Sequence, residues 1–235
     1  MPARIEDYGL IGDCQSVALV DRTGSIDWLC WPSFDSEACF AALLGGPRHG
    51  RWLLTPAAAP LSLSRAYRAD TLILETRFAT ADGEVTLIDF MPLRGEAPDI
   101  VRLVRGERGR VAMRMELVIR FGFGTDIPWV RRIADHTMLA VCGPDMVVLR
   151  TPVATHGENF TTVADFTVAA GETIPFVLSY GPSHRPVPVP IDPQLALEET
   201  AQYWRDWTSG CSYAGHQRDI VTRSLITLKA LTYAP

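Results

Sequence analysis

The chain has 235 residues, 47% of them hydrophobic and 21% charged, which is enough to bury the core of one large β domain or two small ones. Its formal net charge of −5 comes from 27 acidic and 22 basic residues, and no lysine or arginine block predicts binding to nucleic acid or to an anionic membrane. Five scattered cysteines without a C-x-x-C pair argue against a disulfide framework and a zinc site.

The sequence favours a cytoplasmic protein. Residues 1–7 lack the basic stretch followed by an apolar stretch that marks a secretory signal. No apolar run approaches the roughly 20 residues of a membrane-spanning helix, so we expect no membrane partner. The cysteine pattern also favours a reducing compartment.

The first elements predicted are a hairpin and a short helix. Residues 17–20 and 26–29 flank a turn at 21–24, where Gly24 can take a positive φ. A helix is predicted to follow, capped by Asp35 or Ser36 and ended by Gly45. It would bury three apolar side chains, Phe40, Leu43 and Leu44.

Strand patterns dominate the next hundred residues. Residues 72–78 and 85–90 are joined by an Asp-Gly turn, which predicts a second hairpin. Every second residue from Val111 to Phe123 is apolar, as expected for a strand with one face on a core. Strands are also predicted at 160–168 and 173–180. Many short strands separated by Gly, Pro and Asp turns favour an antiparallel β-sandwich over a βαβ fold.

The carboxyl-terminal part is predicted to be helical. Five prolines between residues 182 and 193 indicate an extended strut, and Asp192-Pro193 begins a helix that ends at Gly210. A second helix starts near Gly215 and carries a wide apolar stripe of Ile220, Val221, Leu225, Leu228 and Leu231. Because no later element covers this stripe, we expect the natural chain to continue. In this chain the helix is expected to self-associate, to dock back onto the sandwich, or to be disordered.

The residues alone define no catalytic centre. The five histidines are isolated, and the sequence contains no G-x-S-x-G, P-loop or G-x-G-x-x-G pattern. We therefore expect no metal and no cofactor. One unusual segment, residues 28–36, places aromatic rings beside a carboxylate, an arrangement that suits a sugar. Its alternative interpretation is that Trp28 and Phe34 belong to the core and that Asp35 only caps a helix.

Both ends of the chain carry a resemblance to a known family. Residues 8–20, 24–30 and 32–36 at one end and residues 203–207 and 223–235 at the other closely resemble bacterial trehalase-like and glucoamylase-like proteins of glycoside hydrolase family 15. The resemblance is strong at both ends of the chain and weaker between them.

The resemblance implies an organisation in three parts. These are a β-sandwich of the supersandwich type (1–181), a Pro-rich linker with a helix (182–214), and the first helix of an (α/α)6 catalytic barrel (215–235). It also implies inverting hydrolysis of an α-glucoside such as trehalose or a malto-oligosaccharide by two carboxylic acids. Both acids would lie in the barrel beyond Pro235, so no residue of this chain is expected to be catalytic.

Three functions follow as alternatives. The first is a non-catalytic domain that packs on its own barrel through the residues of the apolar stripe and lines one rim of the active site with Trp31, Phe34 and Asp35. These three residues are expected at the edge of the sandwich and not in its core. The second is a stand-alone carbohydrate-binding module, and the third is an interaction scaffold. A binding module would need exposed aromatic rings, so the exposure of Trp31 and Trp129 separates the first two. Trp28, Trp52 and Trp204 are predicted to be buried.

Overall fold

The computed structural model describes residues 4–233 of the chain, so Ala234 and Pro235 of the predicted barrel helix lie outside the described residues. Two antiparallel sheets share one 20-residue strand, β9 (Asp99–Val118). The first sheet contains β1 (Gly9–Gly12), β2 (Val17–Val20), β3 (Ser25–Cys30), β4 (Ala38–Phe40), β5 (Arg51–Pro56), β13 (His156–Glu158) and β14 (Thr161–Ala169). The second contains β6 (Ser62–Tyr67), β7 (Leu74–Ala79), β8 (Gly83–Phe90), β10 (Trp129–Ala134), β11 (Thr137–Cys142), β12 (Asp145–Arg150) and β15 (Thr173–Pro182).

Strand β9 changes sheets at a glycine-rich bend. Its amino-terminal half pairs with β8 and β15, and its carboxyl-terminal half pairs with β5 and β14. At the bend, a Cβ on Gly106 would lie 2.0 Å from the carbonyl oxygen of Ala169, and Gly109 has a φ of +70°. Glycine is therefore required where neighbouring backbones approach this closely.

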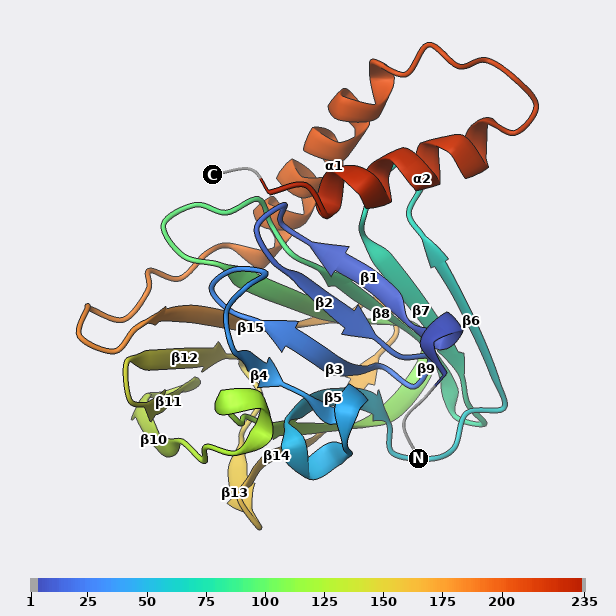
Figure 1. Cartoon of the computed structure of the whole chain (residues 1–235). Helices are drawn as coiled ribbons and strands as arrows, with labels where there is room; N and C mark the ends of the chain where they lie inside the picture. The colour runs from blue at the N-terminus through green and yellow to red at the C-terminus, as the bar shows by residue number, and fades with distance from the viewer. Residues whose placement is uncertain (1–3, 234–235) are drawn as a thin grey trace.

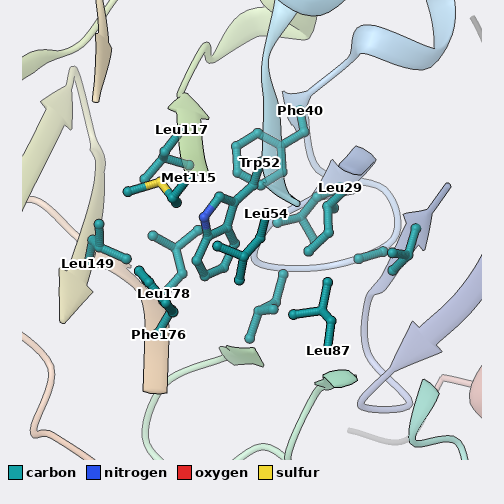
Figure 2. Packing of buried hydrophobic residues seen from close by; sticks show 14 of the residues in the cluster. Leu29, Phe40, Trp52, Leu54, Leu87, Met115, Leu117, Leu149, Phe176 and Leu178 are labelled. Carbon is teal, nitrogen blue, oxygen red and sulfur yellow. The ribbon is translucent and has the colours of Figure 1, made fainter. Parts of the chain in front are cut away.

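The main core lies between the two sheets. Trp52 and Leu54 of β5 face Phe176 and Leu178 of β15 across the sandwich (Figure 2). Alternate residues of β9, from Val111 to Leu117, complete this core, as the period-two pattern predicted. The mainly β sandwich expected from the sequence is confirmed.

Both carboxyl-terminal helices pack on the sandwich at the same end of the molecule (Figure 1). The first, α1 (Pro193–Ser209), begins at Asp192, whose side chain accepts hydrogen bonds from the backbone N–H groups of Gln194 and Leu195. Its apolar face covers the outer side of β8, β9 and β15. The second, α2 (Arg218–Ala230), lies against α1 and β1. The predicted helix start at Asp192-Pro193 and the predicted burial of Trp204 are confirmed, and Leu197 and Ala201 are buried on the same face.

Two predicted elements differ from the structure. The short helix expected after Asp35 is absent. Instead, Ala38–Phe40 forms β4, because Phe40 and Ala38 pair with Leu29 and Cys30 and bury their side chains in the sheet. Only the single turn η2 (Ala42–Leu44) follows, with Leu44 exposed. Three-residue turns also form at η1 (Ile5–Asp7), η3 (Pro47–His49) and η4 (Gly122–Gly124).

The long strand β9 also begins and ends at other residues than predicted. It begins at Asp99, earlier than expected, and ends at Val118. Phe123, the predicted last strand residue, lies in η4 with a φ of +56° and is exposed. Of the tryptophans predicted to be buried, Trp52 and Trp204 are, whereas Trp28 is half-buried with its ring centroid 6.4 Å from that of Phe123.

Candidate functional site

The three predicted rim residues follow β3, but they do not share one environment. Trp31 is only 3% exposed and belongs to the main core, with its ring centroid 6.1 Å from that of Tyr180. The expectation that Trp31 lies outside the core is wrong, because β3 carries its side chain inward next to β15. Phe34 is half-buried and Asp35 is exposed.

A local network of hydrogen bonds fixes the segment around Asp35. The Ser33 hydroxyl donates to Asp35 Oδ1 at 2.6 Å, and the Ser33 backbone N–H donates to the Ser36 hydroxyl. The bond from Ser33 lowers the pKa of Asp35, so its carboxylate is charged at neutral pH and available as an acceptor. Since no helix follows, Asp35 is not a helix cap.

The loop from Asp13 to Ser16 connects this segment to the helices. The Phe34 backbone N–H donates to the Gln15 carbonyl at 3.0 Å. Asp13 is buried, accepts from the backbone N–H groups of Gln15 and Ser16, and forms a salt bridge with Arg94 at 2.8 Å. Between them, Cys14 has a φ of +65° and packs in the small core below the helices. Sequence reasoning assigned no role to this loop, although an Asp at the first position of a turn is a sequence signal.

Helix α2 uses a different face for docking than the predicted stripe. Its buried residues are Thr222, Ile226 and Ala230, spaced four apart, and they pack near Cys14 and Trp204. The predicted stripe lies mostly in solvent: Ile220 is 70%, Leu228 61% and Leu231 49% exposed, and Val221 and Leu225 are half-buried. Of the three outcomes expected for this helix, docking onto the sandwich is the one observed, and self-association stays a prediction.

Arg223 secures α2 to the sandwich. Its guanidinium carbon lies 3.9 Å from the centroid of the Tyr67 ring, and its Nη2 donates to the Thr71 carbonyl at 2.9 Å. The Tyr67 hydroxyl in turn bonds to the backbone of Leu10 in β1. Burial lowers the pKa of Arg223 and raises that of Tyr67. Sequence reasoning missed Arg223, because an arginine beside an apolar stripe usually lies in solvent.

Within residues 4–233, no group of three or more His, Cys, Asp or Glu side chains could hold a metal ion. No helix in the same range is both long and apolar enough to cross a membrane. One candidate surface consists of the charged Asp35 beside the half-buried Phe34, and a single loop connects it to a helix with an exposed apolar face. Such a surface can contact a sugar or another domain.

Fold and surface together define a β-sandwich domain with carboxyl-terminal helices packed on one end. The family model "Trehalase-like, N-terminal" matches residues 1–184, and the chain belongs to this family. It is 26% identical to a trehalase of Thermoplasma volcanium, over 99% of this chain and 38% of that protein. It is 28% identical to a trehalase of Mycolicibacterium smegmatis, over 98% of this chain and 38% of that protein.

The chain thus spans 38% of the length of each of these relatives. A solved structure, a putative kojibiose phosphorylase from the human microbiome, aligns with 93% of this chain and 35% of its own. That alignment has a TM-score of 0.41 at 9% identity, a likeness too low to bear on function.

Proposed function

We propose that this domain is the non-catalytic, amino-terminal part of a cytoplasmic enzyme of glycoside hydrolase family 15 that hydrolyses an α-glucoside. The observation that carries the proposal is that α2 has one buried face and one exposed apolar face. One face is docked on the sandwich through Ile226, while Ile220 and Leu228 on the other are exposed. An exposed apolar helix face of this kind is typical of a surface that meets another domain.

The partner of this face is the enzyme's own (α/α)6 barrel. The relatives named as trehalases support this partner, since each is much longer than this chain and matches it over nearly its whole length. In this arrangement residues 1–181 form the sandwich, 182–214 the linker, and 215–235 the first helix of the barrel. Both catalytic carboxylic acids belong to the barrel, and the substrate is trehalose or a malto-oligosaccharide.

The first test asks whether this chain is catalytic. The purified 235-residue chain is expected to release no glucose from trehalose, maltose or longer α-glucans. Glucose release that persists through rigorous purification would contradict the proposal, above all if Asp35→Ala abolished it.

The second test addresses the interface with the barrel. In the enzyme that carries this domain ahead of its barrel, Ile220→Asp and Leu228→Asp should lower both the melting temperature and the activity, because they place a charge in a buried contact. In the isolated chain the same changes should have no effect. The matched control is Leu61→Asp, an exposed site before β6, which should be neutral in both proteins. If the changes are neutral in the full enzyme, α2 is not the interface.

The rim of the active site is the finer part of the proposal. Phe34 and Asp35 would line it, since the Phe34 N–H is hydrogen-bonded to Gln15, and the neighbouring Cys14 packs against α2. Trp31, although buried, would support the segment from the core side. Asp35→Ala in the full enzyme should reduce kcat with little change in melting temperature. A lowered melting temperature with an unchanged rate would mean that Asp35 has only a structural role.

A further inference from the structure

A cavity of about 650 Å³ is lined by residues of strands that lie at the opposite end of the sandwich from the helices (Figure 1). It lies between the edge strand β10 and the hairpin formed by β13 and β14. Its floor includes the buried side chains of Leu117, Ile119 and Met138. The size falls within the range of small-molecule sites, which are apolar clefts with a few polar groups.

Two aromatic residues at the cavity are largely exposed. Trp129, the first residue of β10, is 88% exposed, and Phe160, in the turn between β13 and β14, is 78% exposed. All six residues of β10 are exposed. Exposed apolar residues that gather around one cavity are typical of a binding surface.

The turn that carries Phe160 is strained. Asn159 and Phe160 form a two-residue hairpin loop in which both have a positive φ, +48° and +61°. Such a loop prefers Asn followed by Gly, because a side chain at the second position is disfavoured there. The chain instead has a phenylalanine, and retained strain of this kind clusters at ligand sites.

A buried arginine supports the strained turn from below. Arg120 lines the cavity, and its Nη1 and Nη2 donate to the Phe160 carbonyl at 3.4 and 3.3 Å. Nη1 also donates to the Ile119 carbonyl. Within residues 4–233 no carboxylate lies within ion-pair distance of Arg120, and none of its hydrogen bonds engages Nε. Arg132, also in the lining, donates to the Thr155 carbonyl at 2.6 Å.

We propose that this cavity binds a short neutral saccharide. Aromatic faces cover the C–H groups of a pyranose, and the side chains of Arg120, Asn159 and Glu158 supply donors and acceptors for its hydroxyl groups. The concave shape favours a small ligand over a flat protein partner. The choice of an α-glucoside as the saccharide rests on the proposed function, whereas the existence of the site does not.

The test is calorimetric titration of the purified chain with trehalose, maltose and maltoheptaose. Cellobiose and inorganic phosphate serve as comparison ligands. We expect saturable binding of an α-glucoside, weakened roughly tenfold or more by Trp129→Ala and by Phe160→Gly. Leu61→Ala, also at an exposed site but outside the cavity, should bind as the parent does.

Phe160→Gly has a second readout that a merely structural residue would not give. Because glycine adopts the positive φ without strain, this change should raise the melting temperature while it weakens binding. A variant that binds less and is also less stable would contradict the role assigned to the turn.

Four results would overturn the proposal. The absence of saturation by any sugar would remove the site, and so would binding that neither variant changes. Binding of phosphate alone would show an anion site instead. A dimer that Trp129→Ala dissociates would show that a second copy covers the cavity. Binding of cellobiose but not of the α-glucosides would show that the cavity binds a saccharide but that its ligand is not an α-glucoside. This result would not depend on whether the domain belongs to an α-glucosidase.

Discussion

Replacing Ile226 by alanine tests whether α2 is held by the face that the structure buries. The side chain is almost fully buried among Cys14, Leu72 and Trp204. The change removes three carbon atoms, worth about 2.4 kcal/mol of transfer free energy at about 0.8 kcal/mol each. A cavity contribution is added, which the half-buried neighbours Leu10 and Trp207 can partly relieve by moving. We expect a loss of about 3 kcal/mol in the free energy that holds α2 on the sandwich.

The matched control is Leu228→Ala on the same helix. Leu228 is largely exposed, so its replacement should change the stability of this chain by no more than about 0.5 kcal/mol. Both variants gain slightly in helix propensity, and this gain is small beside the expected difference.

Hydrogen exchange measured residue by residue is the appropriate assay. If α2 can leave the sandwich without unfolding it, Ile226→Ala should speed exchange of the amides in Arg218–Ala230 and leave those of β9 unchanged. A urea titration followed by circular dichroism gives the global stability alongside. Equal effects of the two substitutions in this chain would refute the assignment of the docked face.

Two further predictions concern buried charges. Arg102 is fully buried, pairs with Asp89 at 2.7 Å and donates to the carbonyls of Trp52 and Gly24, so Arg102→Met should cost about 3–5 kcal/mol in urea unfolding, and adding Asp89→Leu should recover part of it. Burial raises the pKa of Asp99 from 3.8 to about 6. Between these values the folded chain holds a proton on Asp99 that the unfolded chain has lost, so the contribution of Asp99 to stability should fall by about 3 kcal/mol as pH rises from about 4 to about 6. Asp99→Asn should flatten that slope in melting curves recorded across the same pH range, and an unchanged slope would show that another group titrates.

Local sequence signals predicted the elements that depend on neighbouring residues. The Asp-Gly turn before Glu84 specified the β7–β8 hairpin, and Asp192-Pro193 specified the start of α1. In both cases the backbone geometry is decided within a few residues, so the pattern alone is sufficient. The alternation from Val111 to Leu117 was equally informative, because it depends only on which face of the strand meets the core.

The elements that sequence patterns missed depend on distant parts of the chain. The amino-terminal half of β9 contains Arg102, which is buried only because Asp89 and two backbone carbonyls surround it. Residues 37–44 are rich in the helix formers Glu, Ala and Leu, and the pairing of Ala38–Phe40 with β3 overrides that preference. A pattern of apolar residues cannot reveal either arrangement.

The candidate surfaces show the same limit. The apolar stripe on α2 predicted a contact face but not that a second face, built around Thr222, Ile226 and Ala230, would dock. Two of these side chains are small, so the helix can approach the sandwich closely. The pattern around Trp31 indicated a surface segment, yet the ring lies in the core. For the cavity near Phe160, the sequence offered only Trp129, whose exposure was expected to separate a binding module from a supporting domain, because the supporting arginine lies 40 residues from Phe160.

Cys14 lies between the proposed barrel interface on α2 and the proposed rim segment around Asp35, and it connects the two. Cys14 packs against Ile226 and Trp204, and the next residue, Gln15, accepts the hydrogen bond from Phe34. The Asp13–Arg94 salt bridge holds this loop from the other side, so it has little freedom to move alone. A barrel docked on the exposed face of α2 would therefore fix the helix, the loop and the Asp35 segment together. On this argument Arg94→Met, which touches neither α2 nor Asp35, should lower the activity of the full enzyme, and full activity with an intact fold would show that the two surfaces are independent.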